Sequence, residues 1–161
     1  MAQRYSVTRQ IQAPIELVFS RISDIERFAE VNEHIVEIEF LTEQRSGVGT
    51  RFKETRDMNG RRSTTTLELT EYVENDRVRF VADQGGTIWD TVMSVTEKDG
   101  ATELRMVMDA RPYKLMARIV TPLIKGMVTR AVVADMDGLK TRCEKGADAR
   151  GGEPAPRVGR S

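Results

Sequence analysis

Hydrophobic and polar residues alternate with different periods along the chain, and each change of period marks a change of predicted secondary structure. Residues 4–12 alternate apolar and polar side chains, which is typical of a strand with one buried face. From Pro14 onward apolar residues recur at helical spacing, and Asp24 can cap a second short helix over residues 25–31. Strand-like alternation then continues for about eighty residues, until helical spacing returns after Pro112. The pattern therefore predicts a strand, two short helices, six strands and a long C-terminal helix.

Turn signals fix the register of the six central strands. Asn59-Gly60 is a strong hairpin signal, because a type I′ turn needs positive φ at both central positions. The dipeptides Asn75-Asp76, Gly85-Gly86 and Asp99-Gly100 mark the next three turns. Pairing the strands through these turns keeps one apolar face continuous, whereas a slip of one residue would turn charges inward. The predicted pairs include Phe52–Leu67, Val73–Val78, Leu69–Ala82, Phe80–Thr91, Ala82–Trp89, Met93–Met106 and Thr91–Met108.

The C-terminal helix carries one apolar stripe that Thr121-Pro122 interrupts. Proline within a helix removes a hydrogen bond and clashes with the preceding turn, so we expect a kink or a restart with Thr121 as the N-cap. The stripe is bulky before Met127, where it can fill space, and small after it, where it can lie close on a sheet. Its members are Leu115, Met116, Ile119, Val120, Leu123, Met127, Ala131, Ala134 and Gly138.

The end of the chain differs in composition from the rest. Residues 146–161 hold four glycines, two prolines and almost nothing apolar, which cannot offset the entropy of ordering. We therefore expect a disordered tail after a single domain of residues 1–145. The full length of 161 residues suits one domain with its own core.

Charge and composition exclude several classes of protein. The 25 Lys and Arg residues balance 25 Asp and Glu residues, so neither a nucleic-acid-binding surface nor a polybasic membrane anchor is expected. One histidine and one cysteine cannot form a Cys/His zinc site or an internal disulfide, and we expect no metal and no cofactor, although a carboxylate-only metal site stays open. The sequence has neither a long apolar run nor an apolar signal segment at its start. A cytoplasmic protein without stable membrane insertion is the expectation.

The order of elements and several short motifs resemble the START-like, polyketide cyclase/dehydrase and lipid-transport (SRPBCC) superfamily over about residues 3–145. The matching residues are Ile11-x-Ala13-Pro14-x-Glu16-x-Val18-Phe19, Ile25-x-x-Phe28, Gly47-Val48-Gly49-Thr50-x-Phe52, Thr70-Glu71-Tyr72, Asp137-Gly138-Leu139-Lys140 and Glu144. The resemblance implies an α+β helix-grip fold: a seven-stranded antiparallel curved sheet around the long helix, with two short helices between strands 1 and 2. It also implies an elongated cavity, in which members bind lipids, sterols, polyketides, quinones or plant hormones. Some members are enzymes, and the fold alone does not choose among these functions.

The inner face of the sheet is the candidate cavity wall. Methionine thioethers conform to irregular ligands, and the alternative is a filled core that uses methionine. Glu54 and Arg56 share this face with Phe52, and inward charges are costly unless they are paired or wetted. They either grip a polar group of a ligand or reach solvent beyond the helix, and Arg56 is the better candidate for an anionic group. The predicted ligand-binding residues are Phe52, Glu54, Arg56, Leu67, Phe80, Trp89, Met93, Met106, Met108, Met116, Ile119 and Leu123.

Three functions are consistent with these residues. The first is the binding of a hydrophobic small molecule such as a lipid, polyketide or quinone. The second is a polyketide cyclase or dehydratase-like enzyme that moves protons with Glu54, Arg56 or His34. The third is an interaction protein with a filled cavity and an exposed apolar patch, as in chaperone- or ribosome-associated relatives. By parity Tyr72 faces outward, whereas Tyr113 can overhang the cavity opening.

Overall fold

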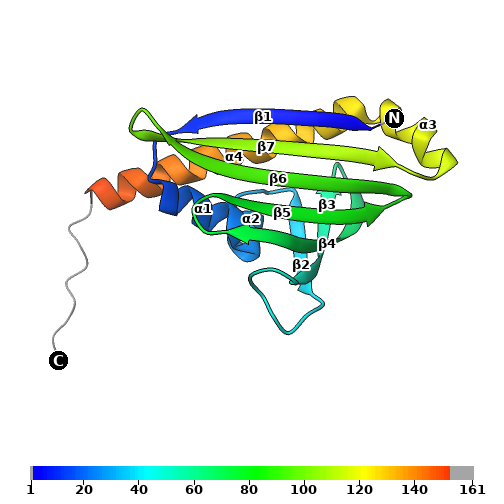
Figure 1. Ribbon diagram of the computed structural model, residues 1–161, viewed down its shortest axis with the longest axis horizontal. Helices are drawn as coiled ribbons and strands as arrows, with labels where there is room; N and C mark the ends of the chain where they lie inside the picture. Colours follow the sequence, from blue (N-terminus) through cyan, green and yellow to red (C-terminus); the bar gives the residue numbers. More distant parts are fainter. Residues whose placement is uncertain (1, 153–161) are drawn as a thin grey trace.

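The computed structural model describes residues 2–152, in which the elements follow the predicted order (Figure 1). The strands are β1 (Gln3–Ile11), β2 (Ile35–Phe40), β3 (Arg51–Met58), β4 (Arg61–Val73), β5 (Arg77–Gln84), β6 (Thr87–Lys98) and β7 (Ala101–Pro112). The helices are α1 (Ile15–Ser23), α2 (Ile25–Glu30), α3 (Leu115–Leu123) and α4 (Lys125–Gly152). The strands form one antiparallel sheet in the order β1-β7-β6-β5-β4-β3-β2, with α4 running behind it (Figure 1). The predicted α+β helix-grip architecture is confirmed.

Three of the four hairpins have the predicted register. Asn59 and Gly60 have φ values of 56° and 83°, as a type I′ turn requires, and Phe52 lies opposite Leu67. The β5–β6 hairpin places Phe80 opposite Thr91, and the β6–β7 hairpin places Met93 opposite Met106. The turn residues and the continuous apolar face therefore predicted these pairings correctly.

The hairpin between β4 and β5 differs from the prediction. Val73 lies opposite Arg77 instead of Val78, and Leu69 lies opposite Phe80 instead of Ala82. The pairing at the turn is displaced by one residue from the expected one, and a register shift between Leu69 and Glu71 adds a bulge to β4.

The bulge also changes which side chains of β4 point to the inner face of the sheet after residue 70. Tyr72 now lies opposite Val78, which is fully buried, so it is on the inner face of the sheet and not on the predicted outer face, although the residue is still 39% exposed. Its ring packs edge to face on Phe19 of α1, with the centroids 5.4 Å apart. The bulge thus joins the end of β4 to the helical layer.

The helices α1 and α2 hold α4 at one end of the sheet. The side chain of Asp24 accepts a hydrogen bond from the backbone N–H of Arg27 at 3.2 Å, so the predicted cap of α2 is confirmed. At Gly138 the backbone of α4 comes so close to the end of α2 that an added Cβ would lie 2.9 Å from the carbonyl oxygen of Val31. The core between α1, α4 and the sheet is built around Val18, Ile22, Leu104, Met136 and Leu139.

The C-terminal helix restarts later than predicted. Pro122 lies in the last turn of α3, the break falls at Ile124, and α4 begins at Lys125, three residues after the expected first position. Thr121 is buried instead of capping α4, and its hydroxyl lies 3.1 Å from the hydroxyl of Thr87. The backbone carbonyl of Gly86 accepts hydrogen bonds from the N–H groups of Tyr113 and Lys114, which fixes the start of α3 against the β5–β6 turn.

Helix α4 continues to Gly152, beyond the predicted domain end at residue 145. The remainder of the predicted tail, residues 153–161, lies outside the described residues. Within the described part of the chain, no helix is both long and apolar enough to cross a membrane.

Candidate functional site

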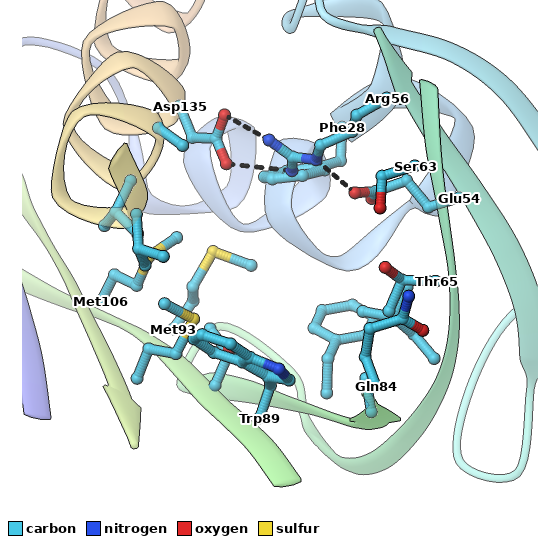
Figure 2. Close-up of a pocket in the computed structure, with 18 of the residues that line it drawn as sticks. Phe28, Glu54, Arg56, Ser63, Thr65, Gln84, Trp89, Met93, Met106 and Asp135 are labelled. Carbon is cyan, nitrogen blue, oxygen red and sulfur yellow. Dashed lines mark hydrogen bonds and ion pairs between the residues drawn. The ribbon is translucent and has the colours of Figure 1, made fainter. Parts of the chain in front are cut away.

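A cavity of about 380 Å³ lies between the concave face of the sheet and the first turns of α4. Strands β3 to β7, helix α2 and helix α4 all contribute to its wall. Figure 2 shows the side chains of Trp89, Met93 and Met106 on one side of this space, and those of Thr65 and Gln84 on the other. The volume falls in the range of about 300–1,000 Å³ that is typical of small-molecule pockets.

Nine of the twelve predicted ligand-binding residues line this cavity. They are Phe52, Glu54, Arg56, Leu67, Phe80, Trp89, Met93, Met106 and Met108. All nine come from the sheet, where strand parity and turn chemistry decide which way a side chain points.

The three predicted residues from the helix do not line the cavity. Met116, Ile119 and Leu123 lie on α3, and their side chains are exposed to solvent. The prediction continued a single stripe through Pro122, whereas the break at Ile124 separates the orientation of α3 from that of α4. The bulky half of the stripe therefore faces outward, and this part of the predicted site is wrong.

The helical wall comes instead from the start and the inner face of α4, together with α2. The lining residues that the sequence did not assign to the site are Ile25, Phe28, Met58, Ser63, Thr65, Ala82, Gln84, Thr91, Ile124, Val128, Val132 and Asp135, of which Ala82 and Thr91 belong to the predicted inner-face pairs. Ala131 and Met127 also line it and belong to the predicted stripe, without having been assigned to the site. Asp135 lies four residues after Ala131, on the same side of the helix as the apolar stripe, and this spacing is the sequence signal that points to Asp135 as a lining residue.

Asp135 completes an ion-pair cluster at one end of the cavity (Figure 2). Arg56 donates from Nε to Glu54 Oε1 at 2.5 Å, and from Nη1 and Nη2 to the two carboxylate oxygens of Asp135 at 3.2 and 3.1 Å. Asn32 donates from Nδ2 to Oδ1 of the same carboxylate. The side chains of Glu54, Arg56 and Asp135 are only 11%, 23% and 8% exposed, so the alternative in which the inward charges reach bulk solvent does not hold.

The electrostatics of the cluster are set by one cation shared between two carboxylates. Burial lowers the pKa of Arg56, but the charges of Glu54 and Asp135 and the bonds to them outweigh this and raise it, so the guanidinium stays charged. Burial raises the pKa of Asp135 by more than Arg56 and Asn32 lower it. With all three side chains ionised, the cluster carries one net negative charge.

This geometry differs from the predicted use of Arg56 as a grip for an anionic group. The paired N–H groups of the guanidinium, which would bind an oxyanion bidentately, already hold Asp135. An incoming anion would have to displace a buried carboxylate. The cluster instead presents carboxylate oxygens, which accept hydrogen bonds.

Other polar side chains face the cavity without partners. Five polar residues line the cavity and form no side-chain hydrogen bond with another described residue: Ser63, Thr65, Gln84, Trp89 and Thr91. Ser63 and Gln84 are exposed, as is Met127 of α4, so these three residues mark the opening to solvent.

Three further residues that the sequence singled out lie away from the cavity wall. The backbone N–H of His34 donates to Asn32 Oδ1 at 3.0 Å, and the half-buried imidazole acts on Asp135 only through its charge. Tyr113 donates its hydroxyl to Asp83 at 2.8 Å and does not line the cavity. Burial raises the pKa of Cys143 to about 11, which leaves its thiol protonated and unreactive.

In the part of the chain that the structure describes, His, Cys, Asp and Glu side chains form no group of three that could hold a metal ion.

Comparison with known proteins agrees with this architecture. The family described as polyketide cyclase / dehydrase and lipid transport matches residues 2–144. No curated protein matches the chain in sequence.

Solved structures share the fold at low sequence identity. The Zhui aromatase/cyclase from a Streptomyces species superposes with a TM-score of 0.79 at 18% identity, over 95% of this chain and 100% of that one. A protein from Thermus thermophilus gives 0.74 at 17% identity, over 90% and 99% of the two chains. Norcoclaurine synthase from Thalictrum flavum, solved with a transition-state analogue, gives 0.71 at 14% identity, over 91% and 96%. At these identities the likeness establishes the fold and not the ligand.

Proposed function

The chain belongs to the polyketide cyclase / dehydrase and lipid transport family, and from that premise we propose that it binds a mostly apolar small molecule between the sheet and α4. The observation that carries the proposal is the apolar cavity of about 380 Å³ with a single charged cluster at one end. A filled core of the same fold would leave no such space, because protein interiors are normally close-packed.

The polar groups of the cavity define the chemistry of the ligand. The cluster of Glu54, Arg56 and Asp135 offers carboxylate oxygens, and its one guanidinium is already bonded to both carboxylates, which favours hydrogen-bond donors and disfavours carboxylates or phosphates. The hydroxyl of Thr65 and the amide of Gln84 can bond to oxygens further along the molecule. The ligand class that fits is therefore an apolar or aromatic molecule that bears hydroxyl or amine groups.

The chain supplies its own optical probe for this proposal. Trp89 is the only tryptophan and lines the cavity, so a bound chromophore should quench its emission. N-phenyl-1-naphthylamine, an apolar amine, is a suitable probe, and native mass spectrometry before and after organic extraction would reveal a ligand that copurifies with the chain.

Two substitutions on the same helix provide the test and its control. Ala131 lines the cavity and Ala134 is exposed, so Ala131→Phe fills the space whereas Ala134→Phe changes only the surface. We expect Ala131→Phe to weaken quenching by the probe at least about tenfold, and Ala134→Phe to leave it unchanged. Equal affinity of the two variants, or no quenching in the wild type, would overturn the proposal.

Catalysis by proton transfer is a second candidate, and one observation favours it. Asp135 has a raised pKa and lies beside an apolar cavity next to a second carboxylate, which is a common arrangement for a general acid or base. In that case the wild type should accelerate enolisation of an apolar β-diketone such as benzoylacetone. Asp135→Asn should abolish the acceleration and leave quenching by the probe intact. A rate equal to that of buffer alone would rule this candidate out.

A further inference from the structure

Helix α3 buries small side chains and exposes large apolar ones, which is the opposite of a typical amphipathic surface helix. It buries its small residues, Ala117 and Thr121, against the sheet. Its large residues point outward, with Leu115 76% exposed and Leu123 78% exposed. A helix that only completes a core would bury the large side chains, so the outer face of α3 has another use.

The exposed face extends beyond α3 itself. We call it the α3 patch, and it consists of Leu115, Met116, Ile119, Val120, Leu123 and Met127. Met127 also lines the cavity, so one member of the α3 patch belongs to the cavity wall as well. Contiguous exposed apolar surface of this kind marks an interaction site.

The charges on the chain segment that carries the α3 patch have one sign. Residues 110–134 contain five cations, at positions 111, 114, 118, 125 and 130, and no aspartate or glutamate. Arg111 is paired with Asp90, whereas the other four form no salt bridge with a carboxylate of the described residues. The acids that contact residues of this segment already have partners: Asp90 is paired with Arg111 and Arg79, and Asp83 accepts a hydrogen bond from Tyr113.

We propose that the α3 patch docks on the surface of a lipid bilayer that contains anionic lipids. Exposed apolar side chains can enter the boundary between headgroups and acyl chains, while Lys and Arg beside them bind anionic headgroups. A second copy of the chain fits less well, because a two-fold contact would bring two sets of unpaired cations together. Docking in this way would hold the cavity opening near the bilayer, and the docking itself does not depend on what the cavity holds.

Vesicle sedimentation tests the proposal directly. The full chain should sediment with vesicles of phosphatidylcholine and phosphatidylserine, much less with phosphatidylcholine alone, and less as salt is raised. Ile119→Ser/Leu123→Ser should weaken binding at least about tenfold, because two exposed apolar anchors are lost. The matched control is Leu41→Ser/Val48→Ser, which removes two exposed apolar residues away from α3 and should bind like the wild type.

A second pair of variants tests the charges. Arg118→Glu/Lys125→Glu should weaken binding at least about twentyfold, since each cation near an anionic surface contributes about fivefold. Arg61→Glu/Arg105→Glu makes the same change of charge at exposed positions of the β3–β4 hairpin and β7, and should have a much smaller effect. Quenching of Trp89 by N-phenyl-1-naphthylamine should be unchanged in every variant, which separates failure of docking from failure of the cavity proposal.

Three outcomes would overturn docking on a bilayer. One is the absence of binding to anionic vesicles. Another is binding that the α3 substitutions do not weaken. The third is a stable dimer in sedimentation velocity that Ile119→Ser/Leu123→Ser dissociates, since the α3 patch would then be an interface between two copies.

Discussion

Arg56 is the residue on which the charged end of the cavity depends. It neutralises part of the repulsion between Glu54 and Asp135, whose carboxylates are both largely buried. Arg56 belongs to β3 and its partner Asp135 belongs to α4, so the ion pair also connects the sheet to the helix. A buried charge that loses its partner is far more costly than a surface charge that does.

Replacement of Arg56 should therefore destabilise the domain strongly. Arg56→Met leaves two buried carboxylates without a cation, and we expect the free energy of unfolding at neutral pH to fall by about 3 kcal/mol. Arg79→Met is the control, because Asp90 keeps Arg111 and Arg79 is 40% exposed; its cost should be about 1 kcal/mol or less. Urea denaturation measures both, and similar losses in the two variants would contradict a special role for Arg56.

Asp135 and Asp90 should give stability opposite dependences on pH. Burial raises the pKa of Asp135, so the stability that it contributes is present below about pH 4 and is lost as the pH rises through its folded pKa. Hydrogen bonds from Arg79 and Arg111 lower the pKa of Asp90 against burial, so its contribution is present above about pH 4 and is lost as the pH falls through its folded pKa.

The measurement compares two variants with the wild type over a series of pH values. The destabilisation by Asp90→Asn should grow from low to neutral pH, whereas that by Asp135→Asn should shrink over the same range. The change of this destabilisation with pH does not depend on any pH-independent loss of stability that the substitution itself causes. Parallel slopes would show that Asp135 is stabilised as a carboxylate like Asp90.

At the scale of elements, the strands were more predictable than the C-terminal helices. Two-residue turns with required φ values specify a register through short-range chemistry, as at Asn59 and Gly60. The bulge between Leu69 and Glu71 has no such local requirement, and it was missed. The orientation of Tyr72 toward Phe19 follows from that bulge and could not be predicted without it.

The helical half of the cavity wall was missed for a different reason. A helix break resets the angular phase of every later residue, and the position of the break within a turn cannot be derived from one proline. A single stripe continued past Pro122 places Leu123 on the cavity side, whereas the break at Ile124 turns Leu123 outward and brings Asp135 to the cavity. The charged cluster therefore depends on tertiary packing that the pattern of the chain does not encode locally.

Close packing of α4 on α2 makes a prediction for two glycines of the same helix. Gly138→Ala would place a Cβ 2.9 Å from the carbonyl oxygen of Val31, whereas Gly126→Ala meets only the end of the Arg130 side chain at 3.7 Å. We expect Gly138→Ala to lower the free energy of unfolding by about 1–2 kcal/mol through overpacking. Gly126→Ala should raise it by up to about 1 kcal/mol, because alanine is the better helix former. Urea denaturation decides, and stabilisation by both substitutions would mean that α4 can move away from α2.

At the scale of the whole molecule, zero net charge conceals a strong segregation of charge. The balance of 25 cations and 25 anions correctly describes the chain but not its surfaces. The cavity holds a cluster with two carboxylates and one guanidinium, while the segment around α3 holds cations alone. A composition total averages over these regions, so it excludes a uniformly basic protein without excluding a local basic surface.

The proposed binding of a ligand in the cavity would also raise the stability of the entire domain. A ligand that binds only the folded state raises the free energy of unfolding by about 2.7 kcal/mol at one hundred times its dissociation constant. The thermal midpoint of the wild type and of Ala134→Phe should therefore rise with the concentration of N-phenyl-1-naphthylamine. Ala131→Phe, which occupies the same space, should show little rise and should itself unfold near the midpoint of the unliganded wild type, because its ring enters a void. Severe destabilisation by Ala131→Phe, together with no response of the wild type to the probe, would mean that the space is closed in solution.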